Sequence, residues 1–131
     1  MHNENVIYDG RKIAAYNIAA DFCKYKEWDE AFLTELWEGL LLNPILYDEF
    51  VYYLQTGELT GNFVCEGYSM YDLYFYHVGY YNMTHDIGRN TGDCDKDEII
   101  FLAFHTMGRL QKDPETYKKK LSESLGMDFG L

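Results

Sequence analysis

The chain of 131 residues is long enough for one domain with a substantial core, and its 47% hydrophobic and 18% aromatic content excludes a disordered chain. Its formal net charge of -11 argues against direct binding to nucleic acid or to an anionic membrane, because both ligands require a basic surface. No apolar run approaches the length of a membrane span, and the N-terminal sequence lacks the pattern of a signal peptide.

The chain begins with a polar lead-in, residues 1–10, which a helical pattern follows. Apolar side chains recur every three or four residues from Arg11 to about Lys26, while polar side chains face away. A second pattern starts at Asp29, whose short carboxylate suits an N-cap, and it places its leucines on one side. We therefore predict two successive helices in this part of the chain.

Asn43 and Pro44 mark the boundary between the second helix and a third. Proline disfavours helical backbone at the residue before it, so the second helix is expected to end at Asn43. The same pair suits the start of the next helix, with the asparagine as N-cap and the proline at the first helical position. Gly57 tolerates the left-handed conformation of a C-cap and should end the third helix, and residues 57–62 should form a loop.

Residues 66–83, with the sequence EGYSMYDLYFYHVGYYNM, leave helix and strand both open. Their composition favours a strand, and Gly79 weakens a helix. At helical spacing, however, most apolar and aromatic side chains fall on one arc, which comprises Tyr68, Met70, Tyr71, Leu73, Tyr74, Phe75, His77, Val78 and Tyr81. We therefore predict a helix whose tyrosines pack inward with their hydroxyls near the surface.

Two further helices are expected after a turn-rich connection. Asp95 suits an N-cap, and Glu98 three residues later completes a capping box, so an apolar and central helix should begin there. Asp113 and Pro114 repeat the pattern of cap and proline and start a sixth helix, which Gly126 should end. The whole chain is predicted to be an all-α, compact single-domain bundle of five or six short helices.

The net charge is confined to one block of the sequence. Residues 27–88 contain eleven acids and no lysine or arginine, whereas the rest of the chain carries eleven acids and eleven bases. Helices usually mix the two signs, because opposite charges one turn apart stabilise them. If the second and third helices turn their acids outward, the result is a carboxylate surface with interspersed tyrosines, formed by Glu35, Glu38, Tyr47, Asp48, Glu49, Tyr52 and Tyr53. Such a surface either binds a basic protein partner or serves solubility alone.

A metal site has only weak candidates in this sequence, namely His77, His85, Asp86 and His105. Metal ligands on helices commonly come in pairs three or four residues apart, and these residues form no such pair. The sequence also lacks a phosphate-binding loop, a dinucleotide fingerprint and a nucleophile motif. We therefore expect no metal, no cofactor and no enzymatic activity, and a metal-dependent enzyme is the least favoured alternative.

The cysteines bear on the cellular compartment. Cys23, Cys65 and Cys94 are far apart and form no Cys-x-x-Cys pair. This spacing indicates free thiols rather than a disulfide framework or a zinc site. Since free thiols are typical of a reducing compartment, we expect a cytoplasmic protein.

Three segments, LLNPILYDEFVYYLQTGELTG, CEGYSMYDLYFY and GRNTGDCDKDEIIFLAFHTM, resemble small uncharacterised proteins carried on mobile genetic elements of anaerobic gut Firmicutes. The resemblance spans roughly residues 28–110 and implies a context, because such elements often encode small acidic proteins that block host defence nucleases. Our leading hypothesis is a non-enzymatic inhibitor of the anti-restriction or anti-CRISPR type. Its carboxylates would mimic the phosphates of a nucleic acid and occupy a basic, nucleic-acid-binding partner. The alternative is a homo-oligomeric structural or regulatory bundle with the tyrosine-rich helix as its interface.

Overall fold

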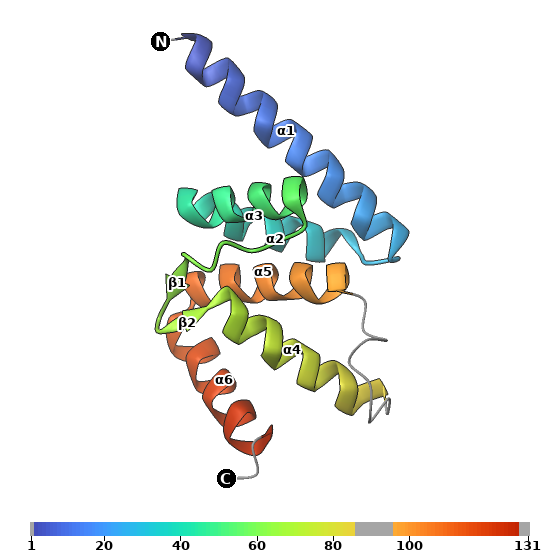
Figure 1. The fold of residues 1–131 in the computed structure, drawn as a ribbon, viewed down its shortest axis with the longest axis vertical. Helices are drawn as coiled ribbons and strands as arrows, with labels where there is room; N and C mark the ends of the chain where they lie inside the picture. Colours follow the sequence, from blue (N-terminus) through green and yellow to red (C-terminus); the bar gives the residue numbers. More distant parts are fainter. Residues whose placement is uncertain (1, 86–95, 129–131) are drawn as a thin grey trace.

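Helices make up nearly all of the regular structure (Figure 1). The computed structural model describes the backbone of residues 2–85 and 96–128, and the surroundings of the side chains of residues 10, 12–79 and 96–123. Within the described backbone, six helices and one short hairpin follow in the order α1 (His2–Tyr25), α2 (Glu30–Leu42), α3 (Pro44–Thr56), β1 (Val64–Cys65), β2 (Tyr68–Ser69), α4 (Met70–His85), α5 (Lys96–Lys112) and α6 (Pro114–Asp128). This architecture confirms the predicted all-α class and the helical bundle.

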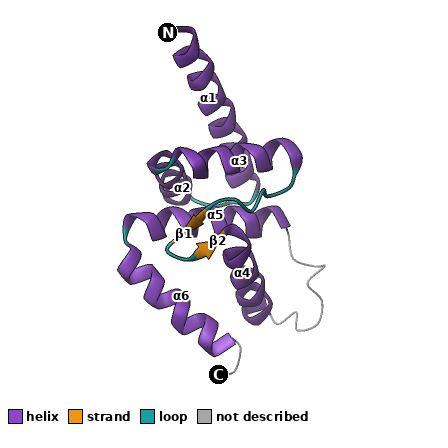
Figure 2. Ribbon diagram, turned by 60° about the vertical axis from the view of Figure 1, so that its left-hand side comes forward, coloured by secondary structure: helices purple, strands orange, loops and turns teal. Residues whose placement is uncertain are grey.

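Helix α5 occupies the centre of the bundle. The pair α2–α3 covers one side of it, and α4 and α6 cover the other (Figures 1 and 2). Accordingly, α5 is buried around most of its circumference, as the sequence predicted, through Ile99, Ile100, Phe101, Ala103, Phe104, Met107 and Leu110. The core is therefore organised around one helix that all of its neighbours share.

Local capping interactions set several helix ends where the sequence predicted them. The Asp29 carboxylate accepts a hydrogen bond from the Phe32 N–H at 2.9 Å and caps α2. The Asn43 side chain accepts from the N–H of Ile45 at 2.8 Å and caps α3. Gly57 closes α3 in the left-handed conformation, with φ of 76°. Each cap satisfies a backbone group that the helix end would otherwise leave unpaired.

The first and last helices are longer than predicted. Helix α1 begins at His2, so the prediction that the helix starts at Arg11, after the polar residues 1–10, was wrong about its start. Its second half packs against the bundle, where Phe22 stacks on Phe101 with ring centroids 4.2 Å apart, and the backbone of its first half projects beyond the other helices (Figure 1). Helix α6 continues past Gly126 to Asp128, because one glycine weakens a helix without stopping it.

A two-residue hairpin precedes α4 and was missed in the sequence. Strands β1 and β2 pair antiparallel through Val64↔Ser69 and Cys65↔Tyr68. Both turn residues, Glu66 and Gly67, have positive φ, at 53° and 84°, which is the geometry of a type I′ turn. The predicted helix over residues 66–83 is thus confirmed only from Met70 onward.

Helix α4 turns a different face to the core than its sequence suggested. Ser69 and Asp72 cap its start by exchanging hydrogen bonds between side chain and backbone, at 2.8 and 3.1 Å. Met70 and Leu73 are buried, whereas Tyr71 and Phe75 are exposed. The prediction that the whole aromatic arc faces inward was therefore wrong for these two rings.

Three other features of the sequence lie outside the described residues. These are the connection over residues 86–94, the cap expected at Asp95 and the third cysteine, Cys94. In the described part of the chain, Cys23 is a buried free thiol and Cys65 a partly buried one. None of the described helices combines the length and the apolar character needed to cross a bilayer.

Candidate functional site

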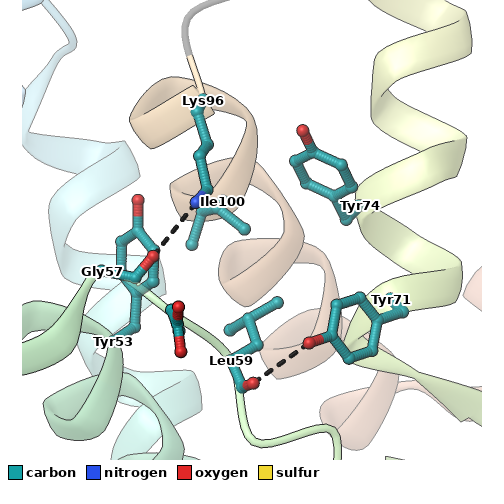
Figure 3. Close-up of a pocket in the computed structure, with 8 residues that line it drawn as sticks. Tyr53, Gly57, Leu59, Tyr71, Tyr74, Lys96 and Ile100 are labelled. Carbon is teal, nitrogen blue, oxygen red and sulfur yellow. Dashed lines mark hydrogen bonds between the residues drawn. The ribbon is translucent and has the colours of Figure 1, made fainter.

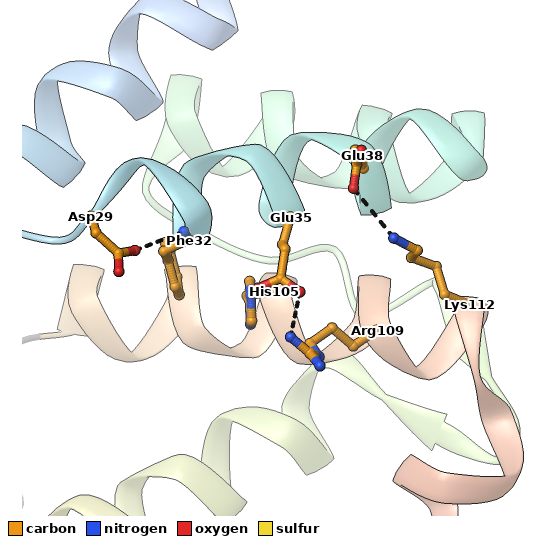
Figure 4. A network of polar contacts seen from close by, with 7 residues as sticks. All are labelled: Asp29, Phe32, Glu35, Glu38, His105, Arg109 and Lys112. Carbon is orange, nitrogen blue, oxygen red and sulfur yellow. Dashed lines mark hydrogen bonds and ion pairs between the residues drawn. The ribbon is translucent and has the colours of Figure 1, made fainter.

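The two acids predicted to face outward from α2 meet bases of the central helix instead (Figure 4). Arg109 donates to Glu35 at 2.5 Å, and Lys112 donates to Glu38 at 3.2 Å. Successive turns of α2 and α5 thus face each other as a ladder of opposite charges. Half-exposed pairs of this kind each stabilise a fold by about 0.2–1 kcal/mol. The absence of bases from residues 27–88 therefore does not leave these two carboxylates uncompensated in space.

Helix α3 divides the other predicted residues between core and surface. Glu49, Tyr47 and Tyr53 are buried, with 4%, 1% and 4% of their surface exposed, whereas Asp48 and Tyr52 are exposed. Helical spacing explains the division, because Glu49 and Tyr53 lie one and two turns beyond the buried Leu46. The expectation that all five residues form one outer surface was wrong for the three buried ones.

The buried Glu49 carboxylate holds the loop that follows its helix. It accepts a hydrogen bond from the Thr60 N–H at 2.6 Å and a second one from the hydroxyl of the same residue. A buried carboxylate is stabilised by such donors, since an unpaired charge in the core would cost several kcal/mol. Glu49 therefore acts as a structural anchor of residues 57–62 rather than as a contact for a partner.

Six described acids of the same block are exposed and cap no helix, and two of these, Glu38 and Glu66, form ion pairs with Lys112 and Lys118. The other four are Glu27 in the turn after α1, Glu30 on α2, Asp48 on α3 and Glu58 in the loop after α3. In α2, in α3 and in the loops that flank them there is no lysine or arginine beyond residue 26. We call these four residues the acidic surface; only Asp48 among them was singled out from the sequence.

The two described histidines lie next to each other but serve the core. The His77 ring Nε2 lies 2.8 Å from the Thr106 hydroxyl, and burial together with the neighbouring His105 lowers the pKa of His77 to about 4. His105 stacks on Phe32 with ring centroids 4.4 Å apart and lies 3.5 Å from a Glu35 oxygen. Burial lowers the pKa of His105 as well, and Glu35 opposes that shift.

Of the weak metal candidates, His85 and Asp86 lie outside the described side chains. Among the side chains that are described, no three histidines, cysteines, aspartates or glutamates converge to hold a metal ion. His77 and His105 instead have a hydroxyl, an aromatic ring and a carboxylate as neighbours. These contacts are those of core histidines.

A pocket of about 400 Å³ opens between the end of α3, the start of α5 and the side of α4 (Figure 3). Its wall contains three tyrosine rings, a lysine, a carboxylate and two aliphatic side chains, from Tyr53, Gly57, Glu58, Leu59, Tyr71, Tyr74, Lys96 and Ile100. We call it the tyrosine pocket. Rings with polar edges around a concave site are typical of ligand and partner recognition.

Sequence reasoning found only part of this pocket. Tyr53 was placed on a recognition surface, but Tyr71 and Tyr74 were assigned to the core-facing arc of α4. Glu58 and Lys96 gave no signal, because each is one charged residue in a loop or at a helix start. The excess of 13 tyrosines over eight phenylalanines was the available hint, since tyrosine suits rings whose hydroxyls stay near water.

Comparisons of the chain with protein-family models, with curated proteins and with solved structures found no match.

Proposed function

We propose that this protein is a non-enzymatic interaction protein that binds a basic, nucleic-acid-binding partner through its acidic surface. The observation that carries the proposal is the exposure of Glu27, Glu30, Asp48 and Glu58 within residues 27–88, which contain no lysine or arginine. Glu30 and Asp48 are fixed on helices, and exposed carboxylates carry negative charge, as the phosphates of a nucleic acid do. A protein that binds phosphates would be attracted to them electrostatically.

Two further points support this function. The net charge of -11 repels nucleic acid and favours encounter with a basic protein. The resemblance of residues 28–110 to proteins of mobile genetic elements suggests a specific form, an inhibitor of a restriction or CRISPR nuclease. In that role the protein would occupy the nucleic-acid channel of the nuclease and would itself need no cofactor.

The test is affinity capture from a lysate of the encoding organism, followed by mass spectrometry. We expect a basic nucleic-acid-binding protein to be captured at about 50 mM salt and released at about 500 mM, because salt screens exposed charges. The double variant Glu30→Lys/Asp48→Lys should lose this partner. The control Glu115→Lys/Glu123→Lys makes the same change in net charge on exposed positions of α6 and should retain it.

The choice of positions follows from the structure. Reversal of Glu35, Glu38 or Glu49 would break ion pairs with α5 or the anchor of the loop, and a loss of binding would then report misfolding. Glu30 and Asp48 are exposed, so their reversal should leave the helical circular dichroism unchanged. Equal capture by the Glu30→Lys/Asp48→Lys variant and the wild type would refute the proposed function.

A homo-oligomeric bundle is the second candidate, and one observation favours it. Phe75 on the tyrosine-rich helix α4 is 65% exposed, a large apolar ring without cover in the monomer. If α4 forms an interface between copies, light scattering should give a mass that rises with concentration, and Phe75→Glu should abolish the rise. A constant monomer mass up to high concentration would exclude this candidate.

A further inference from the structure

The polar groups in the wall of the tyrosine pocket are largely engaged with the protein itself (Figure 3). The Tyr53 hydroxyl donates to Asp97, and the Tyr71 hydroxyl donates to the Leu59 carbonyl oxygen at 3.1 Å. The Lys96 ammonium donates to the Gly57 carbonyl oxygen at 3.1 Å. These bonds fix the groups in place, so the pocket offers a ligand mainly the faces of its rings.

The wall of the pocket is also held rigidly from behind. Tyr71 lies against Gly61, where an added Cβ would come within 2.9 Å of the ring. The loop that contains this glycine is anchored through Thr60 to the buried Glu49 carboxylate. The pocket is therefore preformed, and a ligand need not bear the cost of ordering the loop or the Tyr71 ring.

The charge balance of the pocket favours a cation. Lys96 carries a positive charge, but the adjacent Asp97 and the lining residue Glu58 carry two negative ones. The remaining lining residues are uncharged. Aromatic faces attract cations through their quadrupole, and a carboxylate at the rim supplies the counter-charge.

We propose that the tyrosine pocket binds a guanidinium group, presented as an arginine side chain by a basic protein partner. Guanidinium fits better than ammonium, because it is planar, stacks on aromatic rings and can donate two parallel hydrogen bonds to one carboxylate. Tyr71 and Tyr74 supply ring faces, and Glu58 accepts the hydrogen bonds. This inference rests on the proposed function and adds an anchor to it, since buried arginines commonly dominate the affinity of an interface.

The test uses the full chain and a capped amino acid, N-acetyl-arginine-N-methylamide, titrated while amide resonances are followed by NMR. We expect weak, saturable binding with shifts centred on residues 57–59 and 71–74. The matched citrulline compound has nearly the same shape but no charge, and it should bind about three- to tenfold more weakly. Tyr74→Leu and Glu58→Gln should weaken arginine binding by a similar factor.

A control variant separates the pocket from tyrosines in general. Tyr52→Leu removes an exposed tyrosine from the outer side of α3 and should leave the binding of the arginine compound unchanged. Equal affinities for the arginine and citrulline compounds would overturn the proposal. Stronger shifts with inorganic phosphate at the same residues would overturn it as well, because Lys96 would then dominate the pocket.

The source of the guanidinium is tested with free arginine. Binding of free arginine without binding of the capped compound would overturn the assignment to a protein side chain and indicate a small metabolite instead. The outcome is also separable from the proposed function. Suppose that the Glu30→Lys/Asp48→Lys variant loses the partner and that the wild type does not bind the capped compound. The proposed function of the acidic surface would then be supported, and the proposal that the tyrosine pocket binds an arginine of the partner would be refuted.

Discussion

Helix α2 meets the central helix α5 at a contact between two glycines. Gly39 of α2 and Gly108 of α5 are both buried where the helices cross. A Cβ added to Gly108 would lie 2.7 Å from the Gly39 Cα, and a Cβ added to Gly39 would lie 2.5 Å from the Gly108 Cα. Since both neighbours are backbone atoms, no change of side-chain rotamer can relieve the clash.

Gly108→Ala should therefore destabilise the protein, although alanine is the better helix former. Relief of the clash requires the helices to separate by roughly 1 Å, and such a gap forfeits a quarter to a half of each dispersion contact along the crossing. Overpacking in cores costs about 1–3 kcal/mol, and here the neighbouring contacts of Leu36 and Leu40 are lost in addition. The higher helix propensity of alanine offsets about 1 kcal/mol of these losses, so we expect the free energy of unfolding to fall by about 2 kcal/mol.

The measurement is urea unfolding followed by circular dichroism, with Gly79→Ala as the matched control. Gly79 also lies within a helix, but an added Cβ there meets no atom within 4 Å, so this variant should gain about 0.5–1 kcal/mol. The two substitutions are chemically identical and are expected to have opposite signs. A Gly108→Ala variant as stable as the wild type would refute the close crossing of α2 and α5.

Three further predictions concern single groups. Glu49→Gln should cost about 1–3 kcal/mol in the same assay, because two hydrogen bonds to a buried charge are weakened, whereas Glu123→Gln on the surface of α6 should change stability by less than about 0.5 kcal/mol. The pKa of His77, lowered to about 4, means that the unfolded chain binds a proton there before the folded one, so stability should fall as the pH drops from about 6.5 to 4. The fall should be on the order of 3 kcal/mol, and His77→Gln should reduce it in urea titrations at pH 7.5 and 4.5. Gly57→Ala should lower the free energy of unfolding by about 1 kcal/mol, because φ of 76° strains any residue with a Cβ. An added Cβ meets no neighbouring atom, so this backbone strain is the whole expected effect. An unchanged free energy of unfolding would show that α3 ends differently.

Helix boundaries set by local chemistry were predictable from the sequence. Asp29, Asn43 and Asp113 each accept a hydrogen bond from a backbone N–H two or three residues later, so the signal and its cause lie within one turn. Gly57 acts equally locally through its own backbone conformation. Such boundaries depend little on the rest of the fold.

Features with a weaker local signal were missed. The Glu66–Gly67 turn contains one glycine within a segment that was predicted to be a helix, and the two residue pairs of its hairpin are too short to show an alternating pattern. The start of α1 is polar and lacks the apolar stripe by which a packed helix is recognised. The hairpin was missed because its strands show no alternating pattern, and the start of α1 was missed because it has no apolar stripe.

The candidate site depends on contacts that sequence periodicity does not encode. Helix α3 is apolar or aromatic at most positions, so its inner face is decided by the side that meets α5, and Glu49 follows Tyr53 into the core. Glu35 and Glu38 find their bases 74 residues further along the chain, at a distance set by how α2 crosses α5. The Gly39–Gly108 contact brings the helices close enough for those pairs to form. The net charge of a sequence therefore predicts the total charge of the protein surface. Which carboxylates are exposed and available to a partner depends on how the helices cross.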